Sequence, residues 1–122
     1  MIIKEIKKLQ KLCENKGIKI SLAESCTGGL ISSSLTSIAG SSNFFDSGIV
    51  SYSNKAKIEL LGIDKKLISK YGAVSKEVAL SMSKNLYRIT KSNICVSVTG
   101  IAGPSGGTKQ KPVGTVYFSI YH

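Results

Sequence analysis

The sequence contains one histidine, one arginine and three cysteines, and each scarcity excludes a class of site. The histidine, His122, is the last residue, so a nucleophile activated by histidine is not expected. Cys13, Cys26 and Cys95 are odd in number and have no CxxC spacing. This excludes a disulfide framework and a zinc site, and it indicates a reducing, cytoplasmic environment. Since these residues cannot easily assemble four ligands, no metal is expected.

Long apolar runs are also missing. No stretch reaches the roughly 18 consecutive apolar residues of a membrane-spanning helix, so no membrane partner is expected. The opening MIIKEIKKLQKLCENKG has no apolar h-region, so we do not expect a secretory signal. The remaining composition is that of one globular domain covering residues 1–122.

The net charge of +10 raises the question of nucleic-acid binding. Arg88 is the only arginine, whereas proteins that read grooves and phosphates favour the bidentate fork of arginine. The lysines are scattered, with doublets only at residues 7–8 and 65–66. We therefore do not expect a nucleic-acid partner, and the charge favours, weakly, an anionic small molecule.

Residue periodicity predicts interleaved helices and strands. The helices are expected over residues 2–16, from 27 to about 38, over 55–61 with Asn54 as cap, shortly after Asp64, and after a Ser75 cap. Strands are expected at residues 18–23, 47–53, 94–99 and 114–122. This order predicts an α/β protein, specifically a three-layer α/β/α sandwich with a mainly parallel or mixed sheet.

Two of these strands end in loops of small residues, ESCTGG at 24–29 and TGIAGPSGGT at 99–108. In open α/β sheets the ligand crevice lies beyond the carboxyl ends of the strands, so both loops are expected to border one crevice. Glycine lets backbone N–H groups approach a ligand, and the N-terminus of the second predicted helix would attract a phosphate or an oxyanion. Neither loop matches GxGxxG or the P-loop. The residues alone therefore predict a site for a phosphate-bearing small molecule.

A nucleophile is expected at the first of these loops, where Ser25 and Cys26 are adjacent. Without histidine, the candidate bases are lysine, carboxylate and tyrosinate. Glu24 is a weak candidate, because the side chains of neighbouring strand residues point to opposite faces. The segment SYSNKAK offers Lys55 and Lys57, either of which needs a lowered pKa to act as a base near neutral pH. The residues alone choose neither the lysine nor the nucleophile.

The same segments resemble, in the same order, the CinA C-terminal domain family: AESCTGGL, SGIVSYSNKAK, YGAVSKEVA and SVTGIAGPSGGTKQKPVGTVYF. The resemblance extends from about residue 18 to residue 117. Enzymatic members of this family are nicotinamide-nucleotide amidases, which hydrolyse nicotinamide mononucleotide to nicotinate mononucleotide and ammonia. The resemblance therefore implies the same amidohydrolase activity, a small nucleotide as substrate, no cofactor, and a homodimer.

Carried over by position, the resemblance implies that Ser25 is the nucleophile, Lys57 is its base and Tyr52 assists proton transfer or orientation. It also implies a set of substrate contacts. Backbone N–H groups in the two glycine loops would stabilise the oxyanion, Thr99 would help to bind or orient the substrate, and Ser42 in the AGSSNFF segment would contact it. These residues are Thr27, Gly28, Gly29, Ser42, Thr99, Gly100, Gly103, Gly106 and Gly107.

The sequence departs from the family after the GTVYF strand. Family members continue with a further strand and a closing helix that carries arginines, whereas this sequence ends at His122. The resemblance thus implies a stand-alone domain that is incomplete at its C-terminal end and lacks a substrate arginine, for which Arg88 is no substitute. Two alternatives follow: a nucleotide-binding protein without turnover and, with less support, a competence-linked interaction protein. Residues 114–121 would also form an unpaired edge, which favours self-association.

Overall fold

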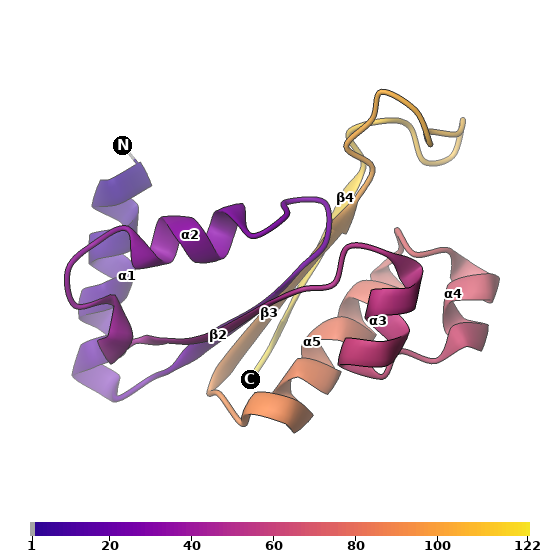
Figure 1. Ribbon diagram of the computed structural model, residues 1–122. Coiled ribbons are helices and arrows are strands. Elements are labelled where there is room, and N and C mark those ends of the chain that lie inside the picture. Colours follow the sequence, from indigo (N-terminus) through magenta and orange to yellow (C-terminus); the bar gives the residue numbers. More distant parts are fainter. Residues whose placement is uncertain (1) are drawn as a thin grey trace.

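The computed structural model describes residues 2–122, which form an alternating series of helices and strands (Figure 1). In chain order the elements are α1 (Ile2–Lys16), β1 (Ile20–Glu24), α2 (Leu30–Thr36), the 3₁₀ turn η1 (Ser41–Asn43), β2 (Phe45–Val50), α3 (Asn54–Leu61), α4 (Lys65–Tyr71), α5 (Lys76–Thr90), β3 (Ile94–Gly100) and β4 (Val116–Tyr121).

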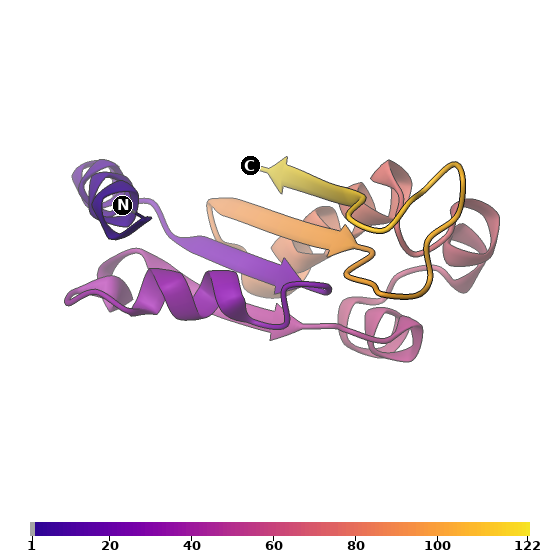
Figure 2. The ribbon, with the colours of Figure 1, turned by 90° about the horizontal axis from the view of Figure 1, so that it is seen from above.

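The four strands form one mixed sheet in the order β2-β1-β3-β4. Strand β1 pairs in parallel with both β2 and β3, while β4 runs antiparallel to β3. Figure 2 shows the strands side by side, with the β4 arrow pointing against the other three. The three parallel strands therefore end at the same edge of the sheet. This arrangement confirms the predicted α/β class.

Helices cover both faces of this sheet and make three layers (Figure 1). Helices α1 and α2 lie on one face, and α3, α4 and α5 lie on the other. Each face has its own apolar core. The first core contains Leu22, Leu35 and Phe44, and the second contains Val78 and Met82 of α5, all of them buried. Burial of such side chains supplies most of the stabilisation of the fold, at roughly 25 cal/mol per Å² of apolar surface.

Strand β1 is buried at every residue, because it lies in the middle of the sheet with helices on both sides. Ile20 and Leu22 face the α1/α2 core, while Ala23 faces the core beneath α5. The site residues that follow β1 therefore emerge from the most constrained strand of the molecule.

Helix caps explain where the helices on the second face begin. Ser75 accepts a hydrogen bond from Val78 N at 3.2 Å, as predicted for α5, and Asp64 accepts one from Lys66 N at 2.9 Å and starts α4. The cap predicted at Asn54 is wrong. Ser53 caps α3 instead, since its side chain accepts from Ala56 N, and Asn54 is the first helical residue.

Other predicted boundaries also differ from the structure by a few residues, and the largest differences are at β2 and α2. Strand β2 covers Phe45–Val50 rather than residues 47–53, because Phe45 pairs with Ile20 at one end and the chain turns toward α3 at the other. Helix α2 covers only Leu30–Thr36, since the preceding residues form the tight turn that leads out of β1.

Strand β4 is an edge of the sheet, and Val116, Phe118 and Ile120 are exposed on the face that α1 and α2 cover elsewhere. An entirely apolar groove of about 330 Å³ lies beside it and is lined by Leu9, Ile20, Leu22, Ile31, Leu35, Ile94, Val96 and Ile120. Helices α1 and α2 thus leave this end of their face open. The homodimer expected from the sequence stays a prediction. In that prediction β4 is the exposed strand edge through which two copies would associate.

Candidate active site

A buried serine and a buried lysine meet at the carboxyl ends of β1 and β2. Lys57 Nζ donates to Ser25 Oγ at 2.9 Å, and the two residues are only 2% and 5% exposed. Ser25 directly follows β1, and Lys57 lies in the first half of α3. Lys57 points inward because it shares a helix face with the buried Leu61, four residues further on.

The other lysine of the segment points away from the site. The side chain of Lys55 is 81% exposed and pairs with Glu59 at 4.0 Å on the outer face of α3. Two residues along a helix turn the side chain by about 200°, so Lys55 and Lys57 occupy opposite faces. The structure therefore places Lys57, and not Lys55, beside Ser25.

The surroundings of Lys57 favour its neutral form. Burial of the amine lowers the pKa of Lys57 below its ordinary value, and the nearby Cys26 opposes this only in part. Within residues 2–122 the ion pairs join Lys8 to Glu5 and Lys55 to Glu59, so no carboxylate holds the proton on Lys57. A buried lysine with a lowered pKa is the arrangement that a lysine base requires.

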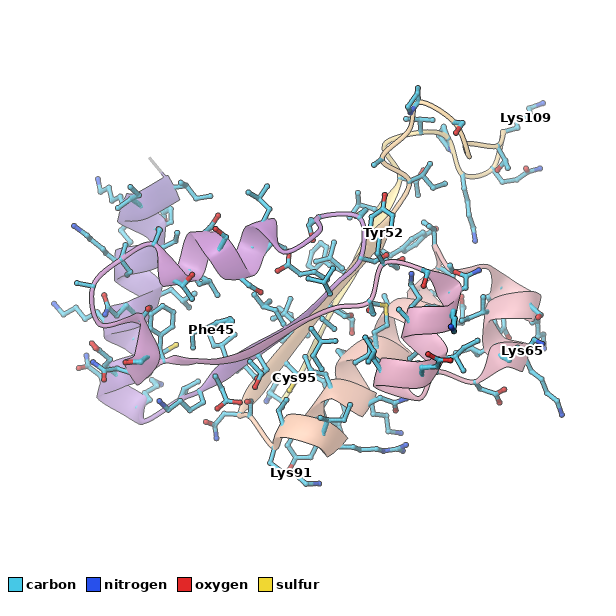
Figure 3. The ribbon with its side chains drawn as sticks, in the orientation of Figure 1. Phe45, Tyr52, Lys65, Lys91, Cys95 and Lys109 are labelled. Carbon is cyan, nitrogen blue, oxygen red and sulfur yellow. The ribbon has the colours of Figure 1, made fainter. Side chains whose placement is uncertain are left out.

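Tyr52 contributes its backbone rather than its ring to this pair. Its carbonyl oxygen accepts from Lys57 Nζ at 3.1 Å and from Ser25 Oγ at 3.4 Å. The side chain is 64% exposed, and its hydroxyl makes no hydrogen bond to residues 2–122. Figure 3 places Tyr52 at the end of the sheet from which the loop of residues 101–115 projects. The proton-transfer role predicted for Tyr52 therefore stays a prediction, and the structure brings its carbonyl to the pair.

Ser51 is a neighbour that the sequence reasoning missed. Its amide donates to Glu24 O at 2.8 Å, which extends the pairing of β1 with β2 and sets Ser51 opposite Ser25. Its hydroxyl is fully buried and has no hydrogen-bond partner among residues 2–122. The parallel pairing of the two strands was the only signal for it, and a sequence does not reveal which strands pair.

We expect Ser51→Ala to raise the free energy of unfolding by about 1 kcal/mol, because a buried hydroxyl without a partner costs roughly 1–3 kcal/mol and alanine removes it with little loss of volume. Urea denaturation followed by circular dichroism measures the change. A lower free energy of unfolding in the variant would mean that the hydroxyl has a partner in solution.

The turn between β1 and α2 presents free backbone donors next to Ser25. Gly28 and Gly29 adopt φ of 59° and 102°, the left-handed region that glycine tolerates best. The amides of Ser25, Gly28 and Leu30 are used within the fold. Three amides of the turn donate to no acceptor among residues 2–122: Cys26, Thr27 and Gly29. These N–H groups are the candidates for stabilising an oxyanion at Ser25.

The N-terminus of α2 is not free to bind a substrate anion, contrary to the sequence-based expectation. The Glu24 carboxylate already accepts from Ile31 N at 2.9 Å and from Ser32 N at 2.8 Å, the amides that such an anion would need. Glu24 is fully buried and is directed away from Ser25, as the alternation of strand side chains predicts. It is therefore not the base of Ser25.

The end of β3 packs directly against this turn. Thr99 is buried and donates from Oγ1 to Ala73 O at 2.9 Å, so its hydroxyl ties β3 to the segment before α5. A Cβ atom on Gly100 would lie 2.9 Å from Cys26 Sγ and 2.9 Å from Thr115 O. Glycine at this position is thus explained by the close approach of three segments, and the predicted substrate contacts of Thr99 and Gly100 stay predictions.

The loop of residues 101–115 projects from the site end of the sheet (Figures 1 and 2), with Lys109 near its tip in Figure 3. Its glycines pack around Val113: a Cβ atom on Gly103 would collide with Val113 Cγ1, and one on Gly107 would lie 2.7 Å from Val113 N. Gly106 has a φ of 93°, and a Cβ atom there would lie 3.7 Å from Ile101 Cγ2, an ordinary contact. The internal packing of the loop accounts for Gly103 and Gly107, and a phosphate contact stays a prediction.

Ser42 lies apart from the other predicted residues. It is exposed in η1, which precedes β2, and its carbonyl accepts from Lys19 Nζ at 2.7 Å. Lys19 precedes β1, so both residues mark the end of the sheet opposite Ser25. A single copy of this chain does not bring Ser42 to the site.

Two further observations concern metals and membranes. Among residues 2–122, no three His, Cys, Asp or Glu side chains lie close enough together to hold a metal ion. None of the helices in this part of the chain has the length and apolar character needed to cross a membrane.

The fold and the site define a mixed-sheet α/β protein with a buried serine–lysine pair where its parallel strands end. The chain belongs to the CinA family, because the model of the CinA C-terminal domain matches residues 3–122.

Relatives and solved structures agree with this membership. A CinA-like protein of Kosmotoga olearia is 49% identical over 110 residues, which are 90% of this chain and 27% of that protein. A CinA-like protein of Geotalea uraniireducens is 51% identical over 109 residues, or 89% of this chain and 26% of that protein. The crystal structure of the competence/damage inducible protein CihA from Agrobacterium tumefaciens is 43% identical with a TM-score of 0.94, over 98% of this chain and 72% of that chain. The present chain thus spans about a quarter of the length of these curated relatives.

Proposed function

We propose that this chain is an amidohydrolase that converts nicotinamide mononucleotide to nicotinate mononucleotide and ammonia, with Ser25 as nucleophile. The observation that carries the proposal is the 2.9 Å contact between Lys57 Nζ and Ser25 Oγ in a buried setting. The family resemblance supplies the substrate, and the geometry supports the type of reaction. The chemistry uses neither a metal nor an organic cofactor.

The reaction begins when neutral Lys57 takes the proton of Ser25 Oγ, which then attacks the carboxamide carbon. The carbonyl oxygen becomes an oxyanion, which the free amides of the turn at residues 26–29 stabilise. Collapse of this intermediate breaks the C–N bond, and the Lys57 ammonium returns its proton to the departing nitrogen, which leaves as ammonia. The product of this step is an acyl ester on Ser25.

Water completes the cycle. Lys57, again neutral, takes a proton from the water molecule that attacks the ester carbon. The ester C–O bond breaks, Ser25 recovers its proton from Lys57, and the nucleotide leaves as a carboxylic acid, which gives its proton to the solvent and becomes the carboxylate. In both steps the Tyr52 carbonyl holds Lys57 Nζ within reach of Ser25 Oγ, because it accepts a hydrogen bond at 3.1 Å.

Purified protein incubated with nicotinamide mononucleotide tests the proposal. We expect ammonia and nicotinate mononucleotide in equal amounts, measured by a coupled glutamate dehydrogenase assay and by chromatography. Nicotinamide and nicotinamide riboside serve as control substrates, since turnover of the mononucleotide alone shows that the phosphate is recognised. Binding of the mononucleotide without ammonia would contradict the proposal and favour a nucleotide-binding protein without turnover.

A further inference from the structure

Glu24 is a buried carboxylate for which the reaction has no direct use. It is fully buried, and its two oxygens accept four hydrogen bonds from a single segment of the chain. Oε1 accepts from Thr27 Oγ1 at 2.6 Å and from Ile31 N at 2.9 Å. Oε2 accepts from Ser32 N at 2.8 Å and from Ser32 Oγ at 2.6 Å. The carboxylate therefore fastens the last residue of β1 to the turn and to the first turn of α2.

These hydrogen bonds determine the charge of Glu24. Burial alone would raise the pKa of the Glu24 carboxyl, but the hydrogen bonds from Ser32, Thr27 and Ile31 outweigh it and hold the pKa below its ordinary value. Hydrogen bonds to a charged acceptor are roughly twice as strong as neutral ones. The carboxylate thus stays ionised in the fold without a cationic partner in the described part of the chain.

The capping of helix α2 differs from that of α3, α4 and α5, the helices on the other face of the sheet. Helices α3, α4 and α5 are capped by the residue directly before them, namely Ser53, Asp64 and Ser75. Helix α2 follows Gly29, which has no side-chain cap. Its cap comes instead from the strand side of the turn, so the five residues 25–29 are enclosed between Glu24 and the amides that Glu24 binds.

We propose that Glu24 is a positioning residue for the reaction at Ser25, and that it holds the turn of residues 25–29 so that the free amides of Cys26, Thr27 and Gly29 face the oxyanion. This inference rests on the proposed function, in which Ser25 attacks an amide. Thr27 is the direct link, because its hydroxyl binds the carboxylate while its own amide stays free. Glu24 contacts neither Ser25 Oγ nor Lys57, so it acts only through the geometry of the turn.

A helix cap without a positioning role would affect stability alone. The chain offers a matched control in Asp64, whose carboxylate caps α4 and is not among the hydrogen-bond partners of Ser25 or Lys57. Removing either cap is expected to lower the free energy of unfolding. Only the loss of Glu24 is expected to alter the turn at Ser25.

The experiment compares the variants E24Q, T27V and D64A with the wild type at a temperature where all four are folded. Glutamine matches glutamate in shape but turns one acceptor oxygen into a donor, which in either orientation of the amide faces a backbone N–H, Ile31 N or Ser32 N, and cannot accept from it. Valine removes only the 2.6 Å bond from Thr27 and covers the case in which E24Q does not fold. We expect kcat to fall roughly 10²-fold in E24Q and at least several-fold in T27V with KM changed less than threefold, as for a misplaced catalytic group. D64A is expected to keep the wild-type kcat.

Labelling of Ser25 by a fluorophosphonate probe, followed by mass spectrometry, gives a second readout that does not depend on the substrate. We expect the labelling rate to fall in the same order as kcat. If the wild type is labelled but releases no ammonia from nicotinamide mononucleotide, the proposed function fails, and the labelling rates still test Glu24. Equal kcat or equal labelling rates in the wild type, E24Q and T27V would overturn the positioning role.

Discussion

Ser25→Ala is expected to lower ammonia release from nicotinamide mononucleotide by roughly 10³-fold or more, as when the nucleophile of a hydrolase is removed. The variant should still fold, because Ser25 is small and, within residues 2–122, its hydroxyl bonds only to Lys57 and weakly to the Tyr52 carbonyl. The measurement is the initial rate of ammonia formation at saturating substrate. Circular dichroism of the same samples shows whether the fold is retained.

Cys26→Ala is the matched control, since Cys26 is the adjacent nucleophile that the sequence leaves open. Lys57 Nζ donates to Ser25 Oγ, and Cys26 Sγ instead lies against Gly100, where a Cβ atom would be 2.9 Å away. We expect Cys26→Ala to keep the rate within a few-fold of the wild type. If Cys26→Ala abolishes ammonia release and Ser25→Ala does not, the assignment of the nucleophile is wrong.

Lys57→Met is expected to abolish the same activity and yet to raise the free energy of unfolding. Lys57 is 2% exposed and has no carboxylate partner among residues 2–122, so its charged form is buried at a cost. Methionine has a similar length and no charge. Replacing a buried polar group whose loss of hydration is not fully compensated by hydrogen bonds raises the free energy of unfolding by about 1–3 kcal/mol. Ser25 Oγ keeps its hydrogen bond to the Tyr52 carbonyl at 3.4 Å, so the substitution leaves no strong hydrogen-bond donor without an acceptor.

The sign of the pH dependence follows from the lowered pKa of Lys57, which burial causes. Between the folded pKa and the unfolded value of about 10.4, the unfolded chain binds more protons, so the contribution of Lys57 to stability improves as pH rises through that window. At pH values below the folded pKa, Lys57 is charged in both states, and the folded state bears the full free-energy cost of burying that charge. The stability gain of Lys57→Met should therefore be largest at low pH and shrink toward high pH.

The rate of the wild type should rise with pH as Lys57 loses its proton, with a midpoint below the ordinary lysine value. A kcat profile from about pH 6 to 10 and thermal denaturation of the two proteins measure these effects. Lys55→Met is the control on the same helix, since Lys55 lies on its outer face and should change neither quantity. A Lys57→Met protein less stable than the wild type would contradict the burial argument.

Local sequence signals were sufficient for most of the fold. Residues 2–16 carry an amphipathic period, Ser75 stands before an apolar helical face, and both helices form as predicted. The errors lie at boundaries, where two neighbouring residues are both acceptable caps. Asn54 and Ser53 are such a pair, and the backbone of the turn after β2 selects Ser53. Burial of β1 on both faces was likewise hidden, because it depends on two layers of helices.

In the candidate site, too, some features follow from the local sequence and others depend on tertiary contacts. The residues alone did not choose between Lys55 and Lys57; the structure shows that Lys55 and Glu59 lie on the outer face of α3, while Lys57 shares the inner face with Leu61. The contribution of Tyr52 could not be found from the sequence either, because a backbone carbonyl leaves no trace in the residue type. Glu24 was correctly placed on the face opposite Ser25, but its four hydrogen bonds depend on the path of the turn.

The sequence by itself determined the α/β class, the order of the elements and the loops that would hold the chemistry, because periodicity, caps and glycine act over a few residues. Only the tertiary structure decided that Ser25 and Lys57, 32 residues apart, meet at 2.9 Å, and that Ser42 lies at the far end of the sheet. Parallel pairing of β1 with β2 and packing of α3 against α5 place Ser25 and Lys57 there. These contacts form between segments distant in the chain, and burial then removes the water that would keep Lys57 charged.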